Sequence, residues 1–199
     1  MNVSPKKANQ NLVRPLILAS GSPRRKELLS QIVSEFEIVP SDAEELKIHE
    51  DGPVKLVETN ARLKADSVAF QNQGHWVIGA DTLVFYNDKI LGKPRDIDEA
   101  VEMLLFLSGK SHKVATGVCL QCMELEFEKT FSETTRVQFK QIDKSSILDY
   151  FSHVDPLDKA GAYAIQSFSE LIIEEFEGSY SNVVGLPVES LGRVLSQLI

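Results

Sequence analysis

Two long segments of alternating apolar and polar residues, at about 113–124 and 126–140, most constrain the fold of this 199-residue chain. Alternation with a period of two is the pattern of a strand that has one buried face. The two segments follow each other almost directly, and such patterning is typical of antiparallel neighbours. We therefore expect a long antiparallel pair around which the other elements are arranged.

The remaining segments switch between strand and helix patterns, which predicts an α/β fold. Short apolar runs predict strands near 16–19, 36–39, 77–86, 89–91 and 171–176. Helical periodicity and capping residues predict helices at about 23–32, 53–70, 96–107, 143–153 and 188–198. The stretch 178–187 has the composition of a turn. We expect a single domain of two lobes over 16–199 and a flexible polar tail over 1–15.

Charge and composition exclude several classes of protein. The net charge is −8 and the pI is about 5.1, which counts against a nucleic-acid-binding protein. No apolar run approaches the roughly 20 residues that span a bilayer. The only cysteines, Cys119 and Cys122, are too few for a four-ligand zinc site and suit a reducing cytosol. We expect a cytoplasmic protein with neither a nucleic-acid nor a membrane partner.

The segment S-G-S-P-R-R at 20–25 joins a predicted strand to a predicted helix. Ser22 is a good N-cap, and Pro23 suits the first helical position. The free N–H groups of a helix N-terminus favour an anion, and the guanidinium groups of Arg24 and Arg25 match phosphate oxygens. The sequence therefore predicts a phosphate site here, although a capped surface helix with two solvated arginines is the alternative.

Three further segments carry candidate groups. In V-I-G-A-D-T at 77–82 the apolar run ends at Asp81, whose carboxylate could hold a divalent ion, accept a proton from water or merely cap a turn. Lys93 lies on a stiff turn between Gly92 and Pro94, where it could meet a phosphate or stay solvated. The loop at 158–166 ends in Gln166, which could hydrogen-bond a base edge or belong to a packed connection.

Six segments of the chain, taken together, resemble the Maf family of nucleotide pyrophosphatases. They are L-I-L-A-S-G-S-P-R-R-K-E-L-L, V-I-G-A-D-T, L-G-K-P-R-D, L-S-G-K-S-H, D-K-A-G-A-Y-A-I-Q and G-S-Y-S-N-V-V-G-L-P. The resemblance runs from Leu16 to the C-terminus. It implies an ITPase-like fold in which a long, twisted mixed sheet separates two lobes around a central cleft. It also implies hydrolysis of a nucleoside triphosphate between the α and β phosphates with Mg²⁺ or Mn²⁺.

The resemblance also implies roles for individual residues. Asp81 matches the family's proposed proton acceptor, and it could position the metal as well. Glu45 matches an acidic residue near the metal. The resemblance places the remaining cationic and hydroxyl groups on the phosphate-contacting loop (Ser20, Arg24, Arg25) and along the cleft as catalytic lysines (Lys64, Lys93). A homodimer is also in line with the family.

Three residues associate the chain with one branch of the family. Members acting on dTTP and UTP resemble it at Arg24, Thr82 and Gln166, whereas a sister group acting on 7-methyl-GTP has an aromatic residue at the first of these positions. The chain departs from the family at Ala164 and Ser167, where glycine is frequent. The alternatives are a 7-methyl-GTP pyrophosphatase and a nucleotide-binding regulator of cell division, since the family's name is linked to septum formation.

Overall fold

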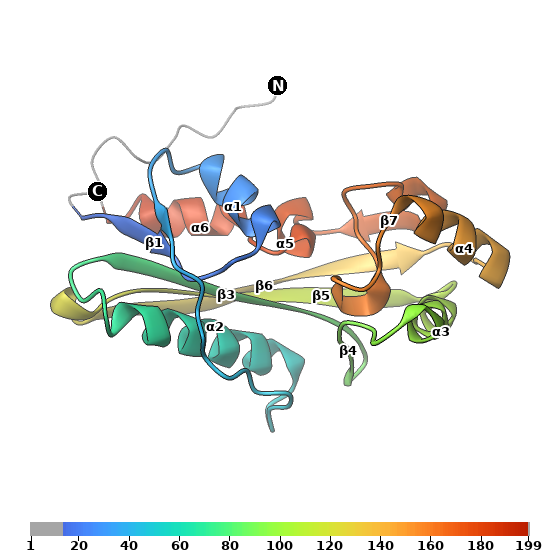
Figure 1. Ribbon diagram of the computed structural model, residues 1–199, viewed down its shortest axis with the longest axis horizontal. Helices are drawn as coiled ribbons and strands as arrows, with labels where there is room; N and C mark the ends of the chain where they lie inside the picture. Colours follow the sequence, from blue (N-terminus) through green and yellow to red (C-terminus); the bar gives the residue numbers. More distant parts are fainter. Residues whose placement is uncertain (1–13, 199) are drawn as a thin grey trace.

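The computed structural model describes residues 14–198, and its single mixed sheet flanked by helices confirms the predicted α/β fold (Figure 1). The strands are β1 (Leu16–Leu18), β2 (Glu37–Ile38), β3 (Trp76–Tyr86), β4 (Lys89–Leu91), β5 (Ser111–Cys122), β6 (Phe127–Phe139) and β7 (Ile173–Glu177). Their order is β2-β1-β3-β5-β6-β7, and β4 pairs with β3. Strand β1 is parallel to β2 and β3, while the other pairs are antiparallel.

The predicted long antiparallel pair is confirmed as β5 and β6. Their register runs from Ser111 opposite Gln138 to Cys122 opposite Phe127. Cys119 and Cys122 are free thiols that belong to apolar clusters on different sides of the sheet. Side chains three positions apart on a strand do point to opposite faces, so these thiols form no common site.

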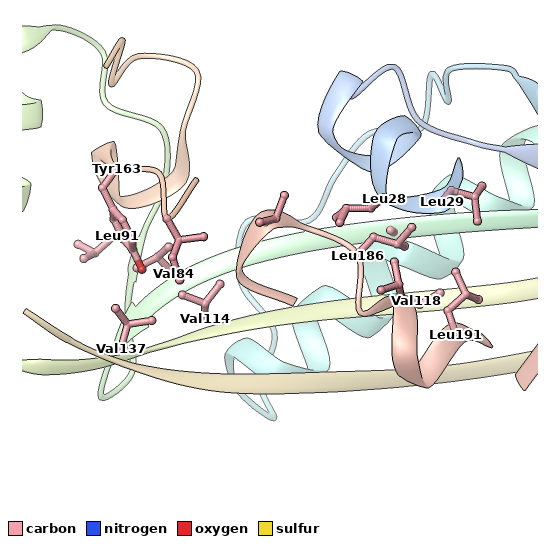
Figure 2. Packing of buried hydrophobic residues seen from close by; sticks show 14 of the residues in the cluster. Leu28, Leu29, Val84, Leu91, Val114, Val118, Val137, Tyr163, Leu186 and Leu191 are labelled. Atoms are coloured by element: carbon pink, nitrogen blue, oxygen red, sulfur yellow. The ribbon is translucent and has the colours of Figure 1, made fainter. Parts of the chain in front are cut away.

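Helices cover both faces of the sheet. They are α1 (Pro23–Ser30), α2 (Pro53–Ala69), α3 (Ile97–Leu107), α4 (Lys144–His153), α5 (Tyr180–Val184) and α6 (Val188–Leu195). Helix α2 lies on one face, and α1, α5 and α6 lie on the other (Figure 1). Between α1 and α6, Leu28 and Leu191 approach Val118 of the sheet, and the same core continues to Val114 and Tyr163 (Figure 2).

Two glycines let α2 rest directly on the strands beneath it. A Cβ atom on Gly79 of β3 would lie 2.1 Å from the carbonyl oxygen of Ala61. A Cβ atom on Gly117 of β5 would lie 2.3 Å from the carbonyl oxygen of Val57. Because real Cβ atoms do not approach backbone so closely, only glycine permits this contact. The close approach brings the polar side chains of α2 next to β3.

One edge of β3 has an opening. On that edge, β3 pairs with β1 from Trp76 to Ile78 and with β4 from Val84 to Tyr86. Residues 79–83 therefore have no strand neighbour there in the part of the chain that the structure describes. The other edge is continuously paired with β5. Three residues of this unpaired stretch line the candidate site, namely Asp81, Thr82 and Leu83.

Two details of the prediction change. The segment predicted as a turn contains the short helix α5, because Ser179 caps it by accepting a bond from the Asn182 N–H at 3.1 Å. A helix of this length is too short to show a period in sequence. Residues 1–13 of the predicted tail lie outside the described residues, while Arg14 bonds Glu124 at 2.9 Å and Pro15 accepts a bond from the Trp76 N–H.

No helix between residues 14 and 198 combines the length and the apolar character that crossing a membrane requires.

Candidate active site

Beside the unpaired stretch of β3 lies a cleft of about 460 Å³, lined by β3, α1, α2 and several loops. Eight of the nine predicted site residues line it, namely Arg24, Arg25, Glu45, Lys64, Asp81, Thr82, Lys93 and Gln166. The ninth, Ser20, is buried beside the cleft and accepts a hydrogen bond from Arg25 at 3.2 Å. The structure thus gathers residues that are far apart in sequence into one cavity.

An ammonium group joins two carboxylates at the centre of the cleft. The Nζ atom of Lys64, on α2, lies 2.7 Å from Oδ1 of Asp81 and 2.8 Å from Oε1 of Glu45. Asp81 is only 5% exposed, and its second oxygen accepts a bond from Asn60 at 3.1 Å. A buried carboxylate requires such partners because transfer of an unpaired charge out of water is costly. Both oxygens of Asp81 are therefore held in a fixed direction.

Among residues 14–198, the guanidinium of Arg25 is hydrogen-bonded only to neutral groups. Its guanidinium donates to the Gly185 carbonyl at 2.9 Å, to Ser20 at 3.2 Å and to Thr82 at 3.1 Å. Burial lowers the pKa of Arg25 below its ordinary value, while the charges of Asp81 and Glu45 act in the opposite direction. A guanidinium oriented by neutral acceptors keeps its charge available for an anion in the cleft.

The neighbouring Arg24 has a different environment. It donates to the Asp158 carboxylate at 2.9 Å, and Lys159 contacts the same carboxylate. Burial acts to raise the pKa of Asp158, but hydrogen bonds from Lys159 and Arg24 outweigh it and lower that pKa. Arg24 is thus linked across the cleft to a loop 134 positions away.

Lys93 and Gln166 line the cleft from two loops. Both residues are exposed, and neither side chain makes a hydrogen bond or ion pair with the residues between 14 and 198. Their loops are nevertheless held by backbone contacts. The Gly161 N–H donates to the Gly92 carbonyl at 3.0 Å, and the Ala164 N–H donates to the Tyr150 hydroxyl at 2.9 Å. Two free polar side chains therefore project from well-anchored loops.

Known proteins resemble this chain over nearly its whole described length. The sequence model of the family described as Maf-like protein matches residues 15–198. The chain belongs to the Maf family. A protein of Bacillus cereus named dTTP/UTP pyrophosphatase is 46% identical over 93% of this chain and 96% of its own length. Proteins of the same name from Ruminiclostridium cellulolyticum and Carboxydothermus hydrogenoformans are 44% and 45% identical, over 94% and 92% of this chain and 97% of each relative.

Within this Maf protein, the direction of the hydrogen bonds around Thr82 can be deduced. The Thr116 hydroxyl lies 2.8 Å from the Asn182 carbonyl, which can only accept, so Thr116 donates its single hydrogen there. In the 2.9 Å contact between the two threonines, Thr82 is then the donor. Arg25 occupies one lone pair of Thr82. A ligand atom that bonds Thr82 must therefore be a donor.

The backbone is unstrained at Ala164 and Ser167, the two positions where the chain departs from the Maf pattern. Neither residue is among the described non-glycine residues with a positive φ. Glycine is therefore not required at these positions, and the Tyr150 hydroxyl bonds both the N–H and the carbonyl of Ala164.

Sequence reasoning missed several polar residues of the site, among them Asn60 and Asp158. Asn60 lies on α2 one turn before Lys64, so a search of the same helical face for polar residues would have found it. Asp158 stands in the quoted segment D-K-A-G-A-Y-A-I-Q, but no local pattern connects it with Arg24.

Proposed function

We propose that this protein is a nucleoside triphosphate pyrophosphatase that hydrolyses dTTP and UTP to the monophosphate and pyrophosphate. The observation that carries this proposal is one cleft that combines a buried carboxylate with cations placed for a polyphosphate. Relatives of 44–46% identity, each named dTTP/UTP pyrophosphatase, support the choice of nucleotide. The protein is therefore a hydrolase with a nucleotide substrate.

The phosphate-binding part of the proposal rests on three groups. The guanidinium of Arg25 faces neutral acceptors, and Lys93 lines the cleft without a partner between residues 14 and 198. The N-terminus of α1 begins beside them, where Ser22 caps the helix and also lines the cleft. Backbone N–H groups at a helix start and nearby cations together stabilise the negative charge of phosphates.

A divalent ion fits the donor set of the cleft. The carboxylates of Glu45 and Asp81 converge on the same ammonium of Lys64, so they lie close enough to share a cation. Residues 14–198 contain no cluster of three or more His, Cys, Asp or Glu side chains that could hold a metal. Mg²⁺ is commonly held by one or two carboxylates together with substrate phosphates. When bound, Mg²⁺ or Mn²⁺ would neutralise phosphate charge.

The chain's own residues account for the rest of the chemistry. We assign Asp81 as the base that accepts a proton from the attacking water while the water oxygen forms a bond to the α-phosphorus. The bond from that phosphorus to the bridging oxygen breaks, and pyrophosphate leaves with the electron pair. Arg25 and Lys64 offset the negative charge that develops in the transition state, and this electrostatic stabilisation is the largest contribution in chemistry of this kind. Lys93 offsets the charge of the bound phosphates.

Selection of the nucleotide is assigned to Arg24, Thr82 and Gln166. Because Thr82 has no free hydrogen, it discriminates by accepting a bond from the ligand. The side-chain amide of Gln166, on the loop at 158–166, offers both hydrogen-bond donors and an acceptor. A site whose polar groups require partners rejects a ligand that leaves them unpaired.

A panel of nucleotides tests the proposal. Pyrophosphate release is measured with dTTP, UTP, CTP, GTP and 7-methyl-GTP, each with Mg²⁺, with Mn²⁺ and with excess chelator. We expect the highest kcat/KM for dTTP and UTP and loss of turnover with chelator. Preferred turnover of 7-methyl-GTP would move the protein to the sister group. Tight binding without release would contradict the enzyme and favour a nucleotide-binding regulator.

A further inference from the structure

We propose that Asn60 is a positioning residue that holds the two acids of the cleft, Glu45 and Asp81, in a fixed relation to each other. The proposal rests on the function proposed for those acids and adds a residue that does not touch the substrate. Asn60 does not line the cleft, and its side chain is 2% exposed on α2.

The amide of Asn60 makes three hydrogen bonds. Its Oδ1 accepts from the Leu46 N–H at 2.8 Å, and its Nδ2 donates to the Leu46 carbonyl at 3.0 Å. The same Nδ2 donates to Oδ2 of Asp81 at 3.1 Å. A primary amide has two N–H donors, so both are used. One side chain thereby connects the backbone next to Glu45 with the carboxylate of Asp81.

The segment 44–48, which contains Glu45, depends on this contact. It lies between β2 and α2 and includes no helix or strand. Its apolar side chains do not anchor it, because Leu46 is 44% exposed and Ile48 is 80% exposed. Among the described residues, its hydrogen bonds and ion pairs to other segments run only to Asn60 and Lys64.

The same contact sets the direction of the Asp81 carboxylate. Lys64 binds Oδ1 at 2.7 Å while Asn60 binds Oδ2, so rotation of the carboxylate is opposed from both sides. Each carboxylate oxygen has two lone pairs, so each keeps one for a ligand in the cleft. Without Asn60, Lys64 alone would hold both acids, and a side-chain ion pair with an exposed partner is a weak constraint.

The substitution Asn60→Leu tests this role because leucine has nearly the same size and makes no hydrogen bond. The control is Ser67→Ala, which removes a different side-chain hydrogen bond between α2 and the loop that precedes it, that of Ser67 to Ser41 at 2.7 Å. We expect kcat with dTTP to fall about 10- to 100-fold in Asn60→Leu, as for residues that orient a metal site. The KM for dTTP is expected to change little, and Ser67→Ala is expected to retain normal turnover.

A second measurement needs neither substrate nor metal. Trypsin cleaves after Lys47, inside the segment that Asn60 holds, and the product is identified by mass spectrometry. We expect faster cleavage at Lys47 in Asn60→Leu than in the wild type or in Ser67→Ala, at matched folded fractions by circular dichroism.

A third measurement follows the binding of Mn²⁺ without nucleotide by electron paramagnetic resonance. We expect this binding to weaken in Asn60→Leu.

Wild-type kcat and wild-type cleavage at Lys47 in Asn60→Leu would overturn the positioning role. If that variant does not fold, Asn60→Ala is compared in the same way, since it also removes all three bonds. The substitution Asp81→Asn separates this proposal from the proposed function. If Asp81→Asn turns over dTTP normally, the assigned base is wrong, while cleavage at Lys47 still decides the role of Asn60.

Discussion

The two walls of the cleft are built differently. On the α2 wall, formed by α2 and β3, Asn60 and Lys64 bind Asp81 in a buried network. On the loop wall, formed by residues 92–93 and 158–166, Lys93 and Gln166 are exposed and free of polar partners among residues 14–198. Charge that must act on a reacting group is most effective when its direction is set beforehand. Groups that bind a ligand can instead remain available until the ligand arrives. The comparison predicts that the α2 wall governs kcat and stability, whereas the loop wall governs KM.

Replacing Asp81, the proposed general base, should give the largest effect. Asp81→Asn keeps the size of the side chain and its place beside Lys64 but removes the proton acceptor. We expect kcat with dTTP to fall by about 10² or more, since general base catalysis contributes on that scale. The control is Asp88→Asn in the exposed turn after β3. Equal turnover by Asp81→Asn and wild type, measured as pyrophosphate release, would remove Asp81 from the mechanism.

Forcing α2 away from the sheet should lower the stability of the folded protein, because the α2 wall depends on this contact. In Gly79→Ala the new Cβ atom would meet helix backbone, so we expect a loss of about 3 kcal/mol in unfolding free energy. Gly192→Ala in α6 is the control, because its Cβ atom would meet nothing within 4 Å and alanine favours a helix. Urea unfolding measures both. A normal midpoint for Gly79→Ala would contradict the close contact of α2 with β3.

On the loop wall, Lys93→Met should change binding and leave the fold intact. We expect KM for dTTP to rise about tenfold, the effect of one charge-assisted hydrogen bond to phosphate. The unfolding free energy should stay within about 0.5 kcal/mol of the wild type, because Lys93 has no polar partner among the described residues. Lys144→Met, at the exposed start of α4, serves as the matched control. A fall in kcat without a change in KM would contradict the division between the walls.

The ion pair between Arg24 of α1 and Asp158 of the loop wall should give the smallest effect. The pKa of Asp158 is lowered in the folded protein, so its ionised form favours folding above the ordinary carboxyl range. This contribution is lost as the pH falls through the lowered pKa. We expect Asp158→Asn to lose less than about 1 kcal/mol near neutral pH, since the pair with Arg24 is partly solvated. Urea midpoints of variant and wild type should converge at acid pH, and a difference that grows there would contradict this sign.

Much of the fold follows from local patterns. The helix at 97–107 is found from its Asp96 cap, and β5 and β6 follow from their alternation. These signals depend on neighbours within a few positions, so a single sequence contains them. The short helix α5 was missed because a helix of about one turn shows no period in the sequence. The site residues Asp81, Arg25 and Lys93 were found through motifs, and the structure places them in one cleft.

The sequence by itself determined the order of the elements, the long antiparallel pair and the segments that mark the Maf family. The tertiary structure alone decided that Asn60 bonds Asp81, that Arg24 pairs with Asp158, and that Thr82 points its hydrogen at Thr116. The physical reason is the range of the interactions. Periodicity and capping act between near neighbours, whereas these bonds join residues 21, 134 and 34 positions apart. Their geometry depends on how closely α2 approaches β3 and on where the sheet opens between β1 and β4.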